Sequence, residues 1–556
     1  MDRRDFLTAM ALASLPGANL AASNAAEHLY QLPPRNGAAT ILHLTDCHAQ
    51  LRPVHFREPD TNISTGSGNE KLAHLSGEAL LKKYGFRKGS REAYAYTHLD
   101  YPELALRYGR MGGFAHLSTL VKRIKSQRPG AMLVDGGDTW QGSATALWTR
   151  GEDMVAASRL LGVEVMSGHW EFTLGSERVM ELTGNMRGSI EFVAQNIFSR
   201  DFGDRIFPTH VMREINGLQI AIIGQAYPYT PIANPRHLVP EWTFGIHEQP
   251  LQEVVDDVRH EGAVAVVLLS HNGADVDLKL AGRIRGIDAI LGGHTHDPLP
   301  QAISVANDGG RTLVTNAGCN GKFLGVLDIR LHGRRAKCDY RLLPVFSDLI
   351  DPDPEMSALI ARLRAPFLSR LETKIAETDA LLYRRGNFNG SFDELILQAL
   401  MRSQEAPIAL SPGFRWGTTL LPGDTVTLED VMAQTAITYP WLNVGELSGS
   451  QIKSTLEDIA DNLFNPDPYY RQGGDMVRAG GITYSCKPAA RMGHRILDLR
   501  LDGAPIEAGR KYRVAGWASV HDTHPGPVPV WDIVTDHLQG IERIAPRRIN
   551  APVLLN

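Results

Sequence analysis

Apolar positions in the first half of the chain are grouped into short runs, each followed by glycine or polar residues. Runs of roughly four to eight apolar, β-branched residues bounded by Gly or Asp are typical of buried strands. Helix-like stretches at 113–126 and 251–260 lie between these runs. Strands that alternate with helices predict α/β layering. The predicted strands are 39–44, 131–134, 163–166, 263–269 and 287–291.

Each predicted strand is followed by a segment that carries His or Asp. In α/β folds functional sites collect at the carboxyl ends of strands, so we expect these side chains to meet. One such residue is commonly a turn or cap residue, but five segments together argue against chance. So many carboxylate and imidazole ligands suit two metals that share a bridge, which predicts a two-metal hydrolase. The predicted ligands are Asp46, His48, Asp138, His169, His271, His294 and His296.

These segments resemble the calcineurin-like metallophosphoesterases, in their two-domain 5′-nucleotidase branch. The resemblance is carried by Asp46-Cys47-His48, Gly137-Asp138, His271 and Gly293-His294-Thr295-His296. It implies a four-layer α/β/β/α domain and a smaller α+β C-terminal domain, joined by a linker helix. It also implies two metal positions with Asp138 as the bridge. The first would be held by Asp46, His48, Asp138 and His296, and the second by Asp138, His169, His271 and His294.

One ligand segment departs from that family, which normally has Gly-Asn-His-Glu there, with Asn as a ligand and His as the catalytic acid. Here His169 replaces the Asn, Trp170 replaces the catalytic His, and Thr173 replaces the Asp that orients that His. Loss of this dyad suggests a less charged electrophile than a phosphoryl group and a leaving group that needs little protonation. A sulfonate sulfur with a sulfur leaving group meets both conditions.

The same segment is similar to the SoxB family of thiosulfohydrolases, as are 138–143 and 411–417. This resemblance implies that the enzyme releases sulfate from a cysteine S-thiosulfonate. The substrate would be carried on the flexible arm of a SoxYZ-type sulfur carrier protein, which binds transiently. We expect two divalent metal ions, with Mn²⁺ as the first choice, although the same ligands accommodate Zn²⁺ or Fe²⁺.

The resemblance also assigns roles beyond the metals. Asp138, His169 and Arg415 are the expected catalytic residues. Arg415 would pair with an anionic oxygen through its planar fork. The expected substrate-binding residues are Arg415, Arg478, Trp170 and Gln141. In nucleotidases two aromatic side chains sandwich the base, and Tyr439 and Trp517 match their positions.

Two rival functions share the metal ligands. The first is a periplasmic 5′-nucleotidase or phosphodiesterase. Two observations count against it: the dyad is missing, and no Gly-Gly-Asp-Gly element follows Trp517. The second is an inactive, metal-bound binding module, which would not need all of the ligands. Turnover of nucleotide and of thiosulfonated peptide distinguishes the three.

The N-terminus predicts export. Arg3 and Arg4 precede an apolar stretch at 9–15 and an Ala-rich segment at 18–26, as in a Tat signal peptide over residues 1–26. The expected location is therefore the periplasm, and no apolar run is long enough to span a membrane. The charge balance is 57 basic against 62 acidic residues, and no basic cluster points to nucleic acid.

The chain is long enough for two or more domains. The predicted catalytic domain covers 38–345, a linker helix covers 346–380, and a substrate-binding domain covers 381–556. In the last of these, 392–402 and 449–464 are expected to be helical. A polar, Tyr-rich insertion at 52–110 follows the first ligands, and the sequence assigns it no role.

Overall fold

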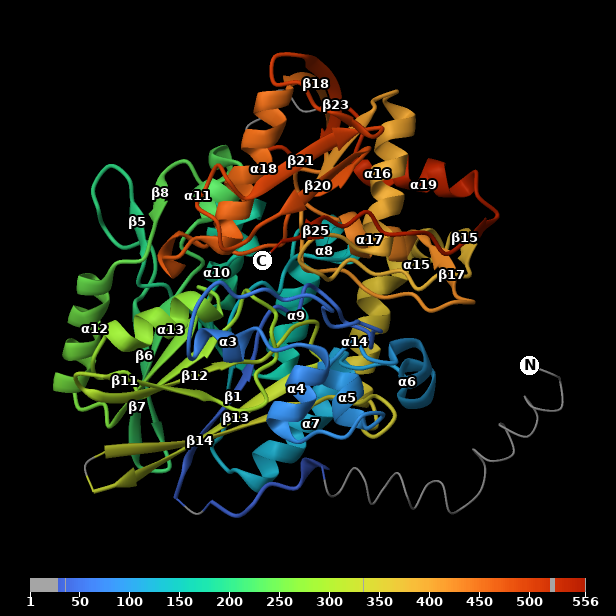
Figure 1. Ribbon diagram of the computed structural model, residues 1–556. Helices are drawn as coiled ribbons and strands as arrows, with labels where there is room; N and C mark the ends of the chain where they lie inside the picture. Colours follow the sequence, from blue (N-terminus) through green and yellow to red (C-terminus); the bar gives the residue numbers. More distant parts are fainter. Residues whose placement is uncertain (1–28, 36, 334, 521–525, 556) are drawn as a thin grey trace.

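The structure is a computed structural model that describes residues 29–35, 37–333, 335–520 and 526–555 (Figure 1). The predicted signal peptide at 1–26 lies outside the described residues. No helix in the described part of the chain is long and apolar enough to cross a bilayer.

The N-terminal domain contains two six-stranded sheets. Their strand orders are β14-β13-β1-β2-β3-β4 and β11-β12-β10-β9-β7-β6. The first sheet consists of β1 (Ala39–Leu44), β2 (Met132–Asp135), β3 (Val163–Met166), β4 (Glu191–Phe192), β13 (Phe323–His332) and β14 (Arg335–Pro344). The second consists of β6 (His210–Ile215), β7 (Leu218–Gln225), β9 (Ala265–Ser270), β10 (Ala289–Gly292), β11 (Ile303–Asn307) and β12 (Gly310–Asn316).

One apolar core, with Ile41 and Val134 from the first sheet and Ile222 and Val267 from the second, joins the two sheets. The strand β9 is buried at every position, as expected for a strand covered on both faces. The helices α7 (Phe114–Gln127) and α9 (Glu152–Leu161) share a second core with the first sheet. The helices α12 (Glu248–His260) and α13 (Ala274–Arg283) do the same with the second sheet. The predicted four-layer α/β/β/α arrangement is confirmed.

Shorter elements complete this domain. They are α8 (Ala144–Thr149), η1 (Trp170–Leu174), α10 (Ser176–Met186), β5 (Ile197–Ser199), α11 (Thr230–Ala233), η2 (Arg236–Leu238) and β8 (Trp242–Phe244). The insertion at 52–110 contains α3 (Glu70–Ala73), α4 (Gly77–Tyr84), α5 (Arg91–Tyr96) and α6 (Tyr101–Tyr108). It reaches the C-terminal domain, since Thr419 N donates to His55 O at 2.7 Å and Ile63 N to Asn387 Oδ1 at 2.7 Å.

The linker is shorter than the sequence predicts. The helix α14 (Pro354–Arg364) begins at the side chain of Asp353, which accepts from Met356 N at 3.0 Å. A short 3-10 turn that contains Pro366 interrupts the helix after Arg364, because proline cannot donate to a helix ladder. The helical part then ends with α15 (Leu368–Leu371). Residues 374–378 form β15 rather than helix, and this strand pairs with β17. The predicted helix over 346–380 is therefore wrong at both ends, because the helical part covers only 354–371.

The C-terminal domain is α+β, as predicted, and lies above the N-terminal domain in Figure 1. Its sheets have the orders β18-β23-β16-β19, β22-β21-β20-β25 and β17-β15-β24. The strands are β15 (Lys374–Thr378), β16 (Ile408–Ser411), β17 (Thr425–Thr427), β18 (Leu442–Ser448), β19 (Arg478–Gly480), β20 (Ile482–Cys486), β21 (Ile496–Leu501), β22 (Ala504–Pro505), β23 (Lys511–Trp517), β24 (Arg543–Ile544) and β25 (Val553–Leu554). The helical elements are α16 (Ser391–Ser403), α17 (Leu428–Thr435), α18 (Gly449–Phe464), η4 (Pro468–Tyr470) and α19 (Val530–Gln539).

Candidate metal centre

The strand ends of both sheets bring all of the predicted ligands to one place. Five strands contribute, namely β1, β2 and β3 of the first sheet and β9 and β10 of the second. The ligands form two groups, and within each group the donor atoms lie within 4.8 Å of one another. One group is His169, His271 and His294, and the other is Asp46, His48, Asp138 and His296; all are buried. The cluster can hold two metal ions.

Asp138 lies between the two groups. Its Oδ2 is 3.3 Å from His48 Nε2, 3.2 Å from His169 Nδ1 and 3.8 Å from His271 Nε2. Its Oδ1 is buried and has no hydrogen-bond partner among the described residues. One carboxylate therefore faces donors of both groups and keeps an oxygen free, which fits a bridging ligand.

The loops that carry the ligands bend sharply. Asp46, His48, Asp138, His294 and His296 all have positive φ, at 51°, 45°, 62°, 71° and 62°. Such a conformation costs non-glycine residues roughly 1–3 kcal/mol each and is concentrated at functional sites. The loops after β2 and β3 also approach each other closely through glycine, because a Cβ on Gly137 would lie 2.8 Å from Gly168 Cα.

Glu171 holds the loops after β2 and β3 together. Its Oε1 accepts from Thr139 N at 2.7 Å and its Oε2 from His169 N at 2.7 Å and Asp138 N at 3.1 Å. Burial and the nearby Asp138 raise the pKa of this carboxyl group. The sequence pattern alone indicates no role for Glu171, although it stands in the same segment as His169.

The electrostatics suit cations. Burial lowers the pKa of His169 to about 4, although Asp138 opposes the change. Burial also lowers the pKa of His294, so both imidazoles are neutral, as a metal ligand must be. Burial would raise the pKa of Asp138, but His48 and His169 outweigh it and keep this group ionised. Burial would lower the pKa of His271, but Asp46 and Asp138 raise it to about 9, so a bound metal would displace a proton there.

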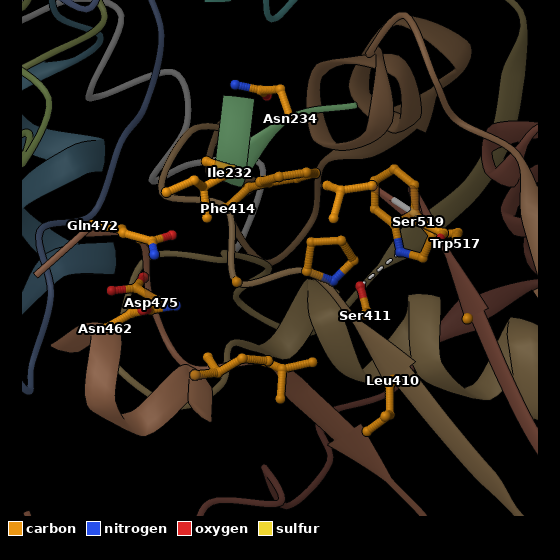
Figure 2. Close-up of a pocket in the computed structure, with 18 of the residues that line it drawn as sticks. Ile232, Asn234, Leu410, Ser411, Phe414, Asn462, Gln472, Asp475, Trp517 and Ser519 are labelled. Atoms are coloured by element: carbon orange, nitrogen blue, oxygen red, sulfur yellow. Dashed lines mark hydrogen bonds between the residues drawn. The ribbon is translucent and has the colours of Figure 1, made fainter. Parts of the chain in front are cut away.

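A cavity of about 1030 Å³ opens above the cluster, between the two domains. Its wall includes Trp170 from the N-terminal domain. Phe414 and Trp517 from the C-terminal domain also line it (Figure 2). The ring centroids of Trp170 and Phe414 lie 5.3 Å apart, and those of Phe414 and Trp517 lie 5.6 Å apart, both edge to face. Tyr439 is not among the residues that line the cavity, because it stacks behind Trp170 at 6.0 Å.

No acid–base group of the metallophosphoesterase type stands at the third ligand segment. Trp170 faces the cavity with an indole ring, and the Thr173 hydroxyl donates to Trp170 O at 2.8 Å. Neither side chain transfers protons at neutral pH, so a leaving group next to Trp170 would receive no proton from this segment.

The structure separates the two arginines that the sequence suggested for substrate binding. Arg415 lines the cavity, and its Nη2 donates to Gly474 O at 2.6 Å while its Nε lies 3.4 Å from Asp475 Oδ1. Its Nη1 has no hydrogen-bond partner in the described part of the chain. Arg478 does not line the cavity; it is fully buried and pairs with Asp393 at 3.1 Å and Asp475 at 3.2 Å. The expectation that Arg478 contacts substrate is therefore corrected, because its donors are used inside the domain.

Gln141 is likewise absent from the residues that line the cavity. Its amide donates to Ala436 O at 2.8 Å, and its Oε1 lies 3.3 Å from His48 Nδ1. If Nδ1 of His48 carries the proton, it donates to Gln141 Oε1. Nε2 then keeps its lone pair and faces the ligand cluster. Gln141 thus orients a ligand instead of contacting substrate.

Tyr227 was missed by the sequence analysis. It follows β7, an apolar run without a ligand at its end. Its ring centroid lies 4.0 Å from that of His169 and 4.5 Å from that of His294. Its hydroxyl donates to Gln472 O of the C-terminal domain at 2.7 Å. The apolar run at 218–225 is the signal that could have placed Tyr227 at this edge of the sheet.

Residues 374–524 match the family model described as 5′-nucleotidase, C-terminal domain. The solved structure of the sulfate thiohydrolase SoxB of Thermus thermophilus has 36% sequence identity and a TM-score of 0.90, and the match covers 95% of this chain and 98% of that chain. A 5′-nucleotidase precursor of Thermus thermophilus has 19% identity and a TM-score of 0.74 over 93% of this chain and 99% of that one, which shows a shared fold.

Among curated relatives, the trifunctional nucleotide phosphoesterase protein YfkN of Bacillus subtilis (strain 168) is 26% identical over 328 residues. That match covers 55% of this chain and 21% of the Bacillus protein, so the chain spans about a fifth of that relative's length.

Proposed function

The chain belongs to the SoxB family, in the 5′-nucleotidase branch of the metallophosphoesterases, and from this premise we propose that it releases sulfate from a cysteine S-thiosulfonate. One observation carries the proposal. The metal cluster is complete, but Trp170 and Thr173 stand where the branch has its acid–base dyad. A site that activates water but offers no proton to the leaving group suits a sulfur leaving group of low pKa.

The side chains divide the work of such a hydrolysis. Two divalent cations, with Mn²⁺ as our first choice, would activate water and stabilise charge on the reacting group. Asp138 would hold both cations, and His169 would complete one of the two positions. Arg415, which lines the cavity and is held by Gly474 and Asp475, would pair with a sulfonate oxygen through its guanidinium. Trp170 would cover the leaving sulfur and exclude bulk water.

The proposed substrate is presented by a protein. The cavity extends from the cluster to the outer residues Ile232 and Val444, which are 60% and 36% exposed. A narrow peptide arm that ends in a modified cysteine can enter between these walls. We propose a SoxYZ-type carrier as this partner, in transient contact with the rim of the cavity. The twin-arginine segment supports a periplasmic location.

The test is a comparison of two substrates on one enzyme preparation. We expect sulfate release from a thiosulfonated carrier peptide and little phosphate release from AMP. Metal content is measured in the same preparation, purified without chelator, to identify the ions. Comparable kcat/KM for AMP would favour the 5′-nucleotidase alternative, which the match of residues 374–524 keeps open. No turnover of either substrate with metals bound would favour the inactive binding module.

A further inference from the structure

The imidazole of His294 belongs to the N-terminal domain, but its outer nitrogen is held by the C-terminal domain. His294 Nε2 lies 3.0 Å from the main-chain oxygen of Gln472. The Tyr227 hydroxyl donates to the same oxygen at 2.7 Å. Gln472 follows η4 and lies beside Asp475 at one side of the cavity (Figure 2). A carbonyl group of one domain therefore contacts a candidate metal ligand of the other.

This contact determines which nitrogen can bind a metal. A carbonyl oxygen only accepts, so Nε2 of His294 carries the proton and Nδ1 keeps its lone pair. His294 Nδ1 is buried without a hydrogen-bond partner among the described residues, and His294 groups with His169 and His271. Partners on the outer nitrogen of a ligating His fix its tautomer and orientation.

We propose that the segment 471–475 positions His294 for the second metal and thereby couples binding of that metal to docking of the C-terminal domain. The proposal rests on the two-metal assignment and not on the identity of the substrate. A coupling of this kind is reciprocal: a cation on His294 also stabilises the docked segment.

The segment is anchored in a way that extends the coupling to the cavity. Asp475 Oδ1 lies 3.4 Å from Arg415 Nε, and Gly474 O accepts from Arg415 Nη2 at 2.6 Å. Arg471 Nη1 pairs with Asp275 of the N-terminal domain at 2.6 Å. The residue that contacts His294 and those that hold Arg415 thus lie within one five-residue segment, so occupation of the second metal position also orders the arginine proposed to bind the sulfonate.

Two neighbouring glycines provide a matched pair of variants. Gly473 and Gly474 have φ of 79° and 77°, so alanine causes similar backbone strain at each. A Cβ on Gly473 would lie 2.3 Å from His294 Nε2, whereas the nearest atom to a Cβ on Gly474 is Gly413 O at 3.8 Å. Only Gly473→Ala displaces the segment from the imidazole.

The experiment is calorimetric titration of Mn²⁺ into metal-free wild type, Gly473→Ala and Gly474→Ala. We expect two sites in the wild type. In Gly473→Ala one site should weaken by about tenfold to a hundredfold, the range for loss of such a ligand partner, while the other is retained. Gly474→Ala should resemble the wild type. Equal binding in the two variants would overturn the coupling, whereas a wild type that binds fewer than two ions would overturn the two-metal assignment instead.

Hydrogen exchange of the wild type provides a second test that needs no substitution. Amides of residues 471–475 should exchange more slowly with two equivalents of Mn²⁺ than with one, because the second ion favours the docked segment. Amides of α16, which lies in the same domain away from His294, are the reference. Equal exchange of 471–475 at both metal levels would also overturn the proposal.

Discussion

Replacement of Arg415 by lysine tests the proposed anion-binding role most directly. The guanidinium donates to Gly474 O, contacts Asp475 Oδ1 and lines the cavity, and its side chain is 12% exposed. A lysine ammonium is a point donor without this planar fork, so it cannot keep the two protein contacts and also pair with a sulfonate oxygen. The variant should therefore lose one charge-assisted hydrogen bond to the substrate.

Such a bond is worth about 1.5–3 kcal/mol. That free energy corresponds to a loss of about tenfold to a hundredfold in kcat/KM. The assay measures sulfate release from one thiosulfonated carrier peptide by wild type, Arg415→Lys and Arg415→Ala, with metals counted in each protein. At saturating Mn²⁺ both metal positions should remain filled in the variants, because Arg415 is not in either ligand group. Wild-type kcat/KM in both variants would refute the reasoning and make Arg415 structural.

Arg478 supplies the contrast, because it pairs with the same Asp475 but does not line the cavity. Arg478→Met removes one buried partner from Asp393 and one from Asp475, although Arg384 still pairs with Asp393 and Arg415 with Asp475. The free energy of unfolding should therefore fall by about 1–3 kcal/mol, the cost of leaving buried polar atoms unsatisfied. Urea unfolding measures this loss. A stable Arg478→Met protein with reduced kcat/KM would contradict the assignment of Arg478 to structure.

Three further outcomes are expected. The Asp138→Asn variant should bind less metal at both positions and show no hydrolysis, because an amide is a poor bridge between two dications. A variant that retains two metals and full activity would exclude Asp138 as the bridge. AMP should be turned over far more slowly than the thiosulfonated peptide, because Trp170 gives no proton to an alkoxide; comparable kcat/KM values would contradict this. Burial would raise the pKa of Asp275, but His74 and Arg471 lower it to about 2. The ion pairs of Asp275 therefore stabilise the folded protein fully above about pH 4. This stabilisation is lost as the pH falls through about 2. The difference in unfolding free energy between wild type and Asp275→Asn should be about 2 kcal/mol at pH 6 and smaller at pH 3; an equal difference at both pH values would contradict the sign.

Short apolar runs and the residues that follow them are enough to predict the layered α/β fold and the residues of the candidate metal centre. Strands β1 and β3 have their predicted bounds, and β2, β9 and β10 differ from the predicted runs by one or two residues. The candidate ligands lie close together because each follows a buried strand, and the carboxyl ends of neighbouring parallel strands share one edge of a sheet. A local pattern is sufficient to predict these ligands, because a short apolar run indicates both a buried strand and the end at which the ligand follows. The domain boundaries stay predictions.

The surroundings of the ligand cluster could not be predicted from local sequence, because they depend on how the two domains pack. Arg415 and Arg478 follow similar glycine-containing segments, but one faces the cavity and the other is buried among aspartates. The contact of His294 with Gln472 joins residues 178 positions apart, and no local pattern reports it. Such roles depend on which donors remain free after the domains have packed. Domain packing depends on contacts between residues far apart in the sequence, whereas each ligand follows from the short segment that contains it.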